Sequence, residues 1–312
     1  IEKLIDGQLH GDDNLVISGA FDLIPGRTTC VSFLDKDKSF ACLEKTKSDL
    51  IIVPDNFDYS DTSKTVILVK NPKESFFKII KKYFYSNSFN YGIHNTAIIS
   101  SEAKIDKNVY IGENVVIESD VIISSGAKIG SNCFIGNKSK IGNNSVLHPN
   151  VTIYKDIMIG SNVEINSASV IGAHGFGILK NNNKLIQVPH IGKVIIQDNV
   201  ILGAGCTIDR ATISDTIIGQ GTKMDGQVHI AHNVKIGKNC IISGQSAIGG
   251  STTLGNNVVL GGQVGIIDNL SIGNNCKVAA KSAVMKSLDD DTIVSGIPAI
   301  EHNKKRRLDV LY

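Results

Sequence analysis

The sequence lacks tryptophan, and aromatic residues supply only 5% of its 312 positions. Proline and methionine are also scarce, with 6 and 3 residues. A core in such a chain cannot be built mainly from aromatic side chains, so aliphatic side chains must fill it. Hydrophobic residues make up 42% of the chain and charged residues 20%, a balance that excludes an intrinsically disordered or a collagen-like protein.

Charge of one sign and long apolar runs are absent as well. The 32 basic residues are nearly matched by 30 acidic ones, which argues against a general binder of polyanions, so we expect no nucleic-acid partner. No window approaches the roughly 20 apolar residues of a transmembrane helix, and the first residues lack the apolar stretch of a secretory signal. The six cysteines form no Cys-x-x-Cys pair, which fits a reducing compartment. We therefore expect a cytoplasmic protein without a transmembrane segment.

What the sequence does contain is an aliphatic residue at every sixth position. One series runs without a gap from Ile93 to Ile171, and a second runs from Ile218 to Val284. Between them the spacing breaks across residues 173–192 and returns briefly at Ile196, Leu202 and Ile208. A spacing of six does not match the helical repeat of about 3.6 but is a multiple of the strand period of two. The ladder predicts short strands separated by corners, because a set of independent hairpins needs no constant spacing.

The residues around the ladder support this interpretation. Glycine often follows the ladder residue and asparagine often comes two positions later, as in Ile111-Gly112-x-Asn114, and both residue types tolerate the backbone angles of a tight corner. Positions two before a ladder residue should also face inward, and four cysteines occupy them: Cys133, Cys206, Cys240 and Cys276. Apolar surroundings raise the pKa of a thiol, so we interpret these cysteines as core residues and not as reactive thiols.

The two flanks of the ladder have different patterns. Within residues 1–92, three apolar runs read as strands and residues 72–84 read as an amphipathic helix opened by Pro72, which together predict a small α/β domain. Residues 289–312 form a C-terminal tail with a short basic helix that contains Lys304, Lys305, Arg306 and Arg307. Two interpretations of this tail stay open, namely solvated charge and a docking patch for an acidic carrier protein.

Two of the eight histidines, His229 and His232, fall within one six-residue repeat. His232 follows the ladder residue Ile230 by two, at a corner where a side chain can point outward, and an imidazole with a pKa near ~6.5 can accept a proton at neutral pH. His232 is therefore the candidate catalytic residue, against the alternative of a surface histidine without a role. A zinc site would need a third histidine in a neighbouring coil, where the chain has Ala247 and Gly250, so we expect no metal.

The ladder resembles that of the hexapeptide-repeat acyltransferases, and the ordered series GFG, VPHIGKVIIQDNV, TIDR, DTIIG and IAHNV resembles the UDP-3-O-(3-hydroxyacyl)glucosamine N-acyltransferase family of lipid A biosynthesis. This resemblance extends over nearly the whole chain. It implies a mainly β fold, with a left-handed parallel β-helix over residues 93–288 that is interrupted by a loop at 173–192. Residues 1–92 would be an α/β domain on the uridine-nucleotide side, and residues 289–312 the helical tail.

The same resemblance implies a reaction. A 3-hydroxyacyl chain would pass from the thioester of acyl carrier protein to the 2-amine of UDP-3-O-(3-hydroxyacyl)glucosamine, with His232 as general base, a role worth about 10²–10⁴-fold. The backbone N–H of Gly250, one eighteen-residue coil later, would stabilise the oxyanion, although a glycine there is equally explained as a corner residue. Asp225 in the preceding repeat is the expected partner of the imidazole. The acyl chain would arrive on phosphopantetheine, and no other cofactor is expected.

Several residues are candidates for substrate binding. Asn233 could position substrate, and Asn269 stands where some relatives have a second histidine and could donate a neutral hydrogen bond. The interruption is assigned to the sugar-nucleotide side, against the alternative of a packing loop, and its candidates are His174, Phe176, Gly177 and His190.

Uracil recognition is expected near Phe33, because the family tends to use a Phe-x-x-Asn-x-x-Tyr segment there. This chain has Lys36 and Ser39 at the last two positions of that pattern. Two possibilities stay open: the loop shifts so that Phe40 stacks on uracil, or Lys36 and Lys38 attract the diphosphate.

An aliphatic interior leaves no internal pocket, so substrates must bind on outer faces, and the resemblance implies a homotrimer with sites between subunits. Two alternatives to this function are a hexapeptide-repeat transferase that is an O-acyltransferase or depends on acetyl-CoA, and a non-catalytic β-helix scaffold.

Overall fold

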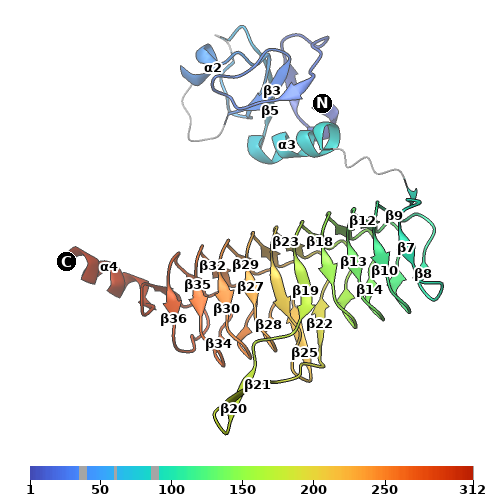
Figure 1. The fold of residues 1–312 in the computed structure, drawn as a ribbon. Coiled ribbons are helices and arrows are strands. Elements are labelled where there is room, and N and C mark those ends of the chain that lie inside the picture. The colour runs from blue at the N-terminus through green and yellow to red at the C-terminus, as the bar shows by residue number, and fades with distance from the viewer. Residues whose placement is uncertain (35–40, 60–61, 86–90, 312) are drawn as a thin grey trace. The chain divides into compact units, whose positions relative to one another are not determined.

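The computed structural model describes residues 1–34, 41–59, 62–85 and 91–311. The chain divides into two compact units, Ile1–Ser88 and Phe89–Tyr312, and each is considered by itself (Figure 1). The candidate residues Lys36 and Phe40 lie outside the described residues, as do Lys38 and Ser39.

The first unit is a five-stranded sheet in the order β1-β5-β4-β3-β2, in which only β1 runs antiparallel to its neighbour. Its strands are β1 Gln8–His10, β2 Gly19–Ala20, β3 Cys30–Phe33, β4 Leu50–Pro54 and β5 Thr65–Val69. Its helices are α1 Glu2–Ile5, α2 Ala41–Lys45 and α3 Pro72–Ile79, and α3 continues as the π-helical turn η1 Ile80–Phe84. The central strands bury residues on both faces, which explains why their sequences are continuous apolar runs.

The second unit is a parallel β-solenoid with three sides, whose strands are mostly two residues long (Figure 1). The first side contains β7 Ile98–Ile99, β10 Val116–Ile117, β13 Phe134–Ile135, β16 Thr152–Ile153, β19 Val170–Ala173, β24 Thr207–Asp209, β27 His229–Ile230, β30 Ala247–Ile248, β33 Gly265–Ile266 and β36 Ala283–Val284. The second side contains β8 Lys104–Ile105, β11 Ile122–Ile123, β14 Lys140–Ile141, β17 Met158–Ile159, β22 Lys193–Ile196, β25 Asp215–Ile218, β28 Lys235–Ile236, β31 Thr253–Leu254 and β34 Ser271–Ile272. The third side contains β6 Gly92–Ile93, β9 Tyr110–Ile111, β12 Lys128–Ile129, β15 Val146–Leu147, β18 Glu164–Ile165, β23 Ile201–Leu202, β26 Lys223–Met224, β29 Ile241–Ile242, β32 Val259–Leu260, β35 Lys277–Val278, β37 Ile293–Ser295 and β38 Ile300–Glu301.

The parallel solenoid predicted from the six-residue ladder is confirmed. Ladder residues pair with ladder residues of the next coil, as Ile117 does with Ile135, and from Ile111 onward their side chains are buried in one continuous core. Ile93 is 55% exposed because it belongs to the terminal coil, which has a neighbour on one side only.

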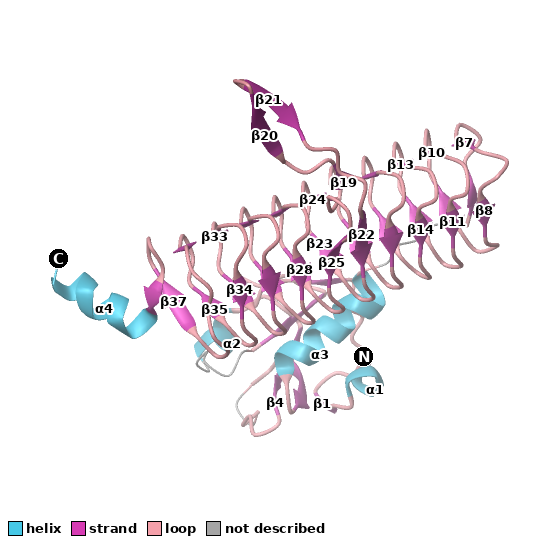
Figure 2. Cartoon of the chain, turned by 90° about the horizontal axis from the view of Figure 1, so that it is seen from below, coloured by secondary structure: helices cyan, strands magenta, loops and turns pink. Residues whose placement is uncertain are grey.

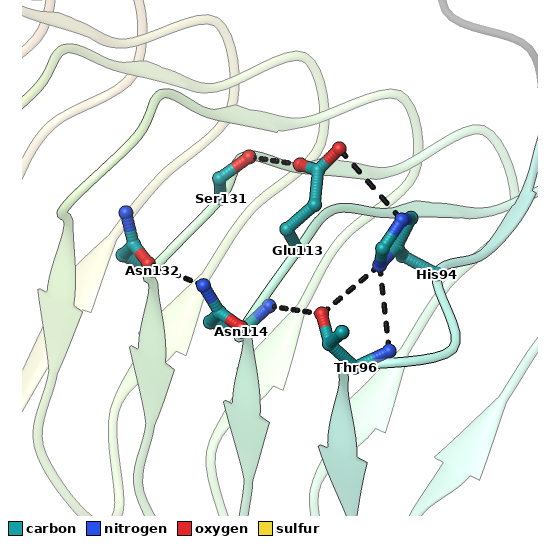
Figure 3. A network of polar contacts seen from close by, with 6 residues as sticks. All are labelled: His94, Thr96, Glu113, Asn114, Ser131 and Asn132. Atoms are coloured by element: carbon teal, nitrogen blue, oxygen red, sulfur yellow. Dashed lines mark hydrogen bonds and ion pairs between the residues drawn. The ribbon is translucent and has the colours of Figure 1, made fainter.

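The corners have the backbone that the asparagine pattern predicts. Asn114 and Asn132 have φ of 56° and 59°, in the left-handed region that asparagine tolerates. Corner side chains also bond from coil to coil: Asn114 Nδ2 donates to Asn132 Oδ1 at 3.3 Å, and the Ser131 hydroxyl donates to Glu113 (Figure 3). His94 Nε2 lies 3.9 Å from Glu113 Oε1 in the same network.

Small polar side chains and thiols occupy many inward positions before the ladder residues. The Ser145 hydroxyl donates to Gly160 O at 2.7 Å and accepts from Val163 N at 3.0 Å, so it satisfies backbone groups at a corner. Cys133 takes the same place and donates to His148 O at 3.2 Å. Burial raises the pKa of the Cys133 thiol to about 11. The four solenoid cysteines are therefore core residues.

The segment expected to be a loop at 173–192 contains a β-hairpin instead. Strands β20 Ile178–Asn181 and β21 Lys184–Gln187 pair antiparallel around Asn182 and Asn183, both of which have positive φ. Asparagine tolerates this conformation, which two-residue hairpin turns require, so the local sequence explains the turn. Figure 2 shows the hairpin projecting from the solenoid.

The C-terminal end closes with β38, which pairs antiparallel with β37, and with helix α4 His302–Leu311. Glu301 caps this helix, because its carboxylate oxygens accept from Asn303 N at 3.0 Å and from Lys304 N at 2.8 Å. Among the described residues, no helix is both long and apolar enough to span a membrane.

Candidate active site

The candidate site lies along one corner of the solenoid, the corner that joins the first side to the second. His232 follows β27 at this corner, and Gly250 follows β30 one coil later. The hairpin segment leaves the solenoid at the same corner, between β19 and β22. The interruption at residues 173–192 and His232, about forty residues later, therefore lie at the same corner, because a solenoid stacks equivalent positions of successive coils.

Hydrogen bonds at the His232 corner determine the tautomer of the imidazole. Asn233 Oδ1 accepts from Thr212 N at 3.0 Å, which identifies that atom as the amide oxygen, and it lies 3.0 Å from His232 Nδ1. An amide oxygen can only accept, so Nδ1 carries the proton and Nε2 keeps its lone pair. Asn233, expected to position substrate, thus has its oxygen engaged within the protein and orients His232.

Gly250 lies against the imidazole of His232. A β carbon at Gly250 would be 2.7 Å from His232 Cε1 and 2.8 Å from Nε2, so no other residue type fits beneath the ring without displacing it. Within the described part of the chain, the backbone N–H of Gly250 makes no hydrogen bond with another residue. This N–H is available for a ligand beside His232.

The hairpin segment contributes further imidazoles to the same place. The ring of His190 lies 5.1 Å from that of His232, centroid to centroid, and the ring of His174 lies 6.4 Å from that of His190. His190 is buried, with Nδ1 at 2.8 Å from Val188 O, whereas His174 is exposed. Gly175 is squeezed between His190 and His232, because a β carbon there would approach both side chains to within 3 Å.

Asp209 and His229 also belong to this histidine cluster, and neither was predicted as a site residue from the sequence. Asp209 Oδ2 lies 3.9 Å from His229 Nε2, and His229 Nδ1 lies 2.8 Å from Thr207 Oγ1. Burial raises the pKa of the Asp209 carboxyl, while the charges of His229, His232 and His190 act in the opposite direction. The signal in the sequence was the ten-residue spacing from Ile208 to Ile218, which marks an enlarged corner.

Asp225 was expected to be the partner of the His232 imidazole, but the structure does not place it beside His232. Asp225 follows β26 at the corner between the third and first sides, where its carboxylate accepts from Gly226 N at 2.7 Å and Gly244 N at 3.2 Å. Nearness in sequence was misleading here, because a whole side of the solenoid separates the two corners. The imidazole instead contacts Asn233 and His190, and it lies against Gly250.

Arg210 anchors the base of the hairpin segment. Its buried guanidinium donates to Gly172 O at 2.7 Å, to Gly192 O at 3.4 Å and to Lys155 O at 2.8 Å. Gly172 comes just before the segment, and Gly192 is its last residue. Arg210 therefore holds the two ends of the hairpin segment together.

A pocket of about 510 Å³ opens on the first side next to His232. Small residues of β30, β33 and β36 form its floor, among them Ala247, Gly265 and Ala283. Phe176, 85% exposed, and Asn269 also line it, and the Asn269 side chain donates to Asp268 at 2.8 Å. The pocket thus brings together Phe176, His232, Gly250 and Asn269 of the expected site residues.

The other expected residues lie elsewhere or contribute differently. Gly177 lies against His190, since a β carbon there would be 3.0 Å from Cε1 of that ring. Phe33 packs against Phe76, with ring centroids 4.8 Å apart, and its role in uracil binding stays a prediction. The basic residues of the tail, Lys304, Lys305, Arg306 and Arg307, lie on α4.

The cluster can hold and move a proton. In neutral His232 the lone pair is on Nε2, the Gly250 N–H can donate to an oxyanion, and the carboxyl group of Asp209 is buried beside His229. In the described part of the chain, no three side chains of histidine, cysteine, aspartate or glutamate come together in a way that could hold a metal ion.

Comparison with known proteins identifies the family. The family described as Bacterial transferase hexapeptide (six repeats) matches residues 108–141, 138–173 and 215–250. The chain is 49% identical over 314 residues to the UDP-3-O-acylglucosamine N-acyltransferase of Methylacidiphilum infernorum, covering 100% of this chain and 89% of that protein. It is 48% identical over 305 residues to the enzyme of the same name from Christiangramia forsetii, covering 97% and 89%.

Solved structures support the fold. The Arabidopsis UDP-N-acetylglucosamine acyltransferase superposes with a TM-score of 0.62 at 22% identity, covering 70% of this chain and 77% of that one, which shows a shared fold. The family itself is shown by the relatives that are nearly half identical over almost their whole length. The chain is therefore an N-acyltransferase that belongs to the UDP-3-O-acylglucosamine N-acyltransferase family of lipid A biosynthesis.

Proposed function

We propose that this N-acyltransferase transfers a 3-hydroxyacyl chain from the thioester of acyl carrier protein to the 2-amine of UDP-3-O-(3-hydroxyacyl)glucosamine. The observation that carries the proposal is the geometry of one corner. An imidazole with its Nδ1 bonded to Asn233 Oδ1 lies over the free N–H of Gly250, at the edge of an outer pocket.

The reaction needs a base because the attacking amine must lose a proton as the amide forms. The amine nitrogen attacks the thioester carbonyl carbon, and His232 Nε2 takes the proton from that nitrogen. When the carbon–sulfur bond breaks, the leaving thiolate of phosphopantetheine takes the proton from Nε2. No other cofactor enters this scheme, and His232 is restored at the end.

The tetrahedral intermediate carries a negative oxygen, and Gly250 is the proposed donor to it. Its N–H lies beside His232 and is not used in a hydrogen bond within the described chain. A backbone donor placed where the charge develops costs no reorganisation during the reaction. Glycine at position 250 also leaves room for the imidazole of His232.

The substrates are proposed to bind in a groove closed by a second copy of the chain, within a homotrimer. The pocket next to His232 lies on the outside of the solenoid, and the hairpin segment beside it exposes apolar side chains, including Phe176, Leu179 and Leu185 at 60% or more. Such a patch is typical of a protein interface. Sedimentation should show a trimer, and an active monomer would contradict this part of the proposal.

The donor is proposed to dock through the basic side of α4, in a reducing cytoplasm that suits the six free cysteines. Acyl carrier proteins of the class required here are acidic, so the cluster from Lys304 to Arg307 would attract them by charge. The alternative, solvated charge without a partner, predicts no effect when these charges are reversed.

The purified protein should be tested with 3-hydroxyacyl carrier thioesters of graded chain length and UDP-3-O-acylglucosamine. The product should be an amide, acetyl-CoA should be a poor donor, and His232→Ala should lower kcat by about 10²-fold or more. His94→Ala is the matched control, because His94 lies on the terminal coil of the solenoid. Full activity of His232→Ala would contradict the proposed base, and ester formation on a sugar hydroxyl would favour the O-acyltransferase alternative.

A further inference from the structure

In the described part of the chain, the carboxylate of Asp209 lies next to the histidine cluster around His232, and Asp268 lines the pocket beside it. Asp209 ends strand β24, which pairs with β27 so that Thr207 lies beside His229 and Ile208 beside Ile230. Its side chain is 10% exposed, and Oδ2 lies 3.9 Å from His229 Nε2. Desolvation disfavours the charged form of a carboxyl group in such a buried place, so neighbouring groups must stabilise a charge there.

The groups around Asp209 counteract the effect of burial, which raises the pKa of its carboxyl group. His229 faces it from β27, His232 from the corner after β27, and His190 from the hairpin segment, and the charge of each favours the carboxylate. Arg210, the next residue, directs its guanidinium to backbone carbonyls, and the carboxylate charge that acts on it is that of Asp156. The neighbours of Asp209 are therefore three imidazoles, one of which is the proposed base.

Without Asp209, this cluster of imidazoles would be an unfavourable place for His232 to take up a proton. If His232 takes a proton, a positive charge appears in a partly enclosed site where two other imidazoles lie nearby, and His190 is almost fully buried. An opposite charge within a few ångströms favours the protonated imidazole and raises its pKa. Asn233 cannot do this, because its amide carries no net charge.

We infer that Asp209 is a positioning residue for the acyl transfer: its buried carboxylate supplies the negative charge that balances the proton on His232 and holds His229 next to the pocket. This inference rests on the proposed role of His232 as the base. Asp209 contacts no reacting atom in this account, and it acts only through the imidazoles.

The test is the pH dependence of kcat/KM in Asp209→Asn, which removes the charge and keeps the shape. Without the opposite charge, proton uptake by the base should become less favourable, so the low-pH limb should move about one pH unit lower and the plateau should fall about tenfold. Asp198→Asn is the matched control, since Asp198 is an exposed carboxylate that accepts from Ser161 N at a corner and should leave the midpoint unchanged.

A second measurement follows the same pH dependence without turnover. Diethyl pyrocarbonate modifies neutral imidazole, so the rate of labelling at His232, followed by mass spectrometry against pH, should show the same downward shift. Asp209→Ser provides a second variant without the charge. A lower plateau or melting temperature with unmoved midpoints in both measurements would show a merely structural role and overturn the inference. Absence of acyl transfer by the unmodified enzyme would instead contradict the proposed function.

Discussion

The α carbon of Gly250 lies so close to His232 that a β carbon on it would be 2.8 Å from Nε2. The two residues are eighteen positions apart, which is one full coil of the solenoid. Gly250 is not among the glycines with positive φ, so the need for glycine comes from the imidazole and not from the backbone. The position of the His232 imidazole and the position of the proposed oxyanion donor thus both depend on Gly250.

Gly250→Ala should therefore separate activity from stability. The methyl group would displace the ring of His232, which can rotate away at little cost in folding free energy, but a displacement of about 1 Å can lower kcat about 10²-fold. The melting temperature and kcat measure the two effects. Gly262→Ala is the control, because a β carbon at that corner would meet its nearest neighbour, Gly244 O, at an ordinary 3.6 Å. An active Gly250→Ala variant would contradict the close contact.

Asn233→Ala should lower both stability and activity. The substitution removes the acceptor of Thr212 N and of His232 Nδ1, so it should cost about 1 kcal/mol beyond the cost of placing alanine at a φ of 62°. Asn257→Ala shares the left-handed backbone, with φ of 58°, and loses only an exposed hydrogen bond to Asn275, so it serves as the control for that second cost. Denaturant unfolding and kcat should be measured on both variants. Equal losses in the two would show that Asn233 is only a corner residue.

Arg210→Met should loosen the hairpin segment. Three carbonyl groups would lose their donor in a buried place, which should lower the free energy of unfolding by roughly 3 kcal/mol. Trypsin should then cut faster at Lys180 and Lys184, which are exposed on the hairpin. Arg210→Lys keeps the charge but not the geometry of the guanidinium and should give an intermediate rate. Unchanged cleavage in Arg210→Met would show that the segment is held by other contacts.

The solenoid cysteines should make stability depend on alkaline pH. Burial raises the pKa of Cys133 from its ordinary 9.0 to about 11, so the folded state favours the neutral thiol. Its contribution to stability is present below pH 9 and is lost as the pH rises toward about 11, because the unfolded chain releases the proton first. Melting temperatures between pH 8 and 11 measure this loss, and Cys133→Ser should reduce it. At pH 8 a thiol reagent should modify the solenoid cysteines only after unfolding.

Charge reversal on α4 should weaken the use of the carrier protein. Lys304→Glu with Arg306→Glu is the suitable pair because both residues are exposed, whereas the stem of Lys305 packs next to Gly296. The KM for acyl carrier protein should rise about tenfold at low salt, and the difference should shrink as salt screens the charges. Lys104→Glu, on an early coil, is the control. An unchanged KM would favour the interpretation as solvated charge.

The fold could be predicted from the sequence because its signal is periodic. A ladder residue such as Ile117 has the same environment as Ile135 one coil later, so one pattern repeated many times specifies strand, corner and core together. The same period relates His232 to Gly250 and predicts that both lie at one corner. The hairpin turn at Asn182 and Asn183 was missed, because nothing in the ladder specifies what an interruption contains.

The sequence by itself thus determined the solenoid, its buried thiols and the corner that carries His232, since each follows from a constant spacing. Only the tertiary structure decided what surrounds that imidazole. His190 approaches it from the hairpin segment, which lacks the six-residue period. Asn233 holds its Nδ1, and Asp209 rather than Asp225 belongs to the neighbouring histidine cluster. The physical reason is that a repeat converts sequence distance into position along the axis, whereas side-chain contacts at an enlarged corner depend on how irregular segments pack.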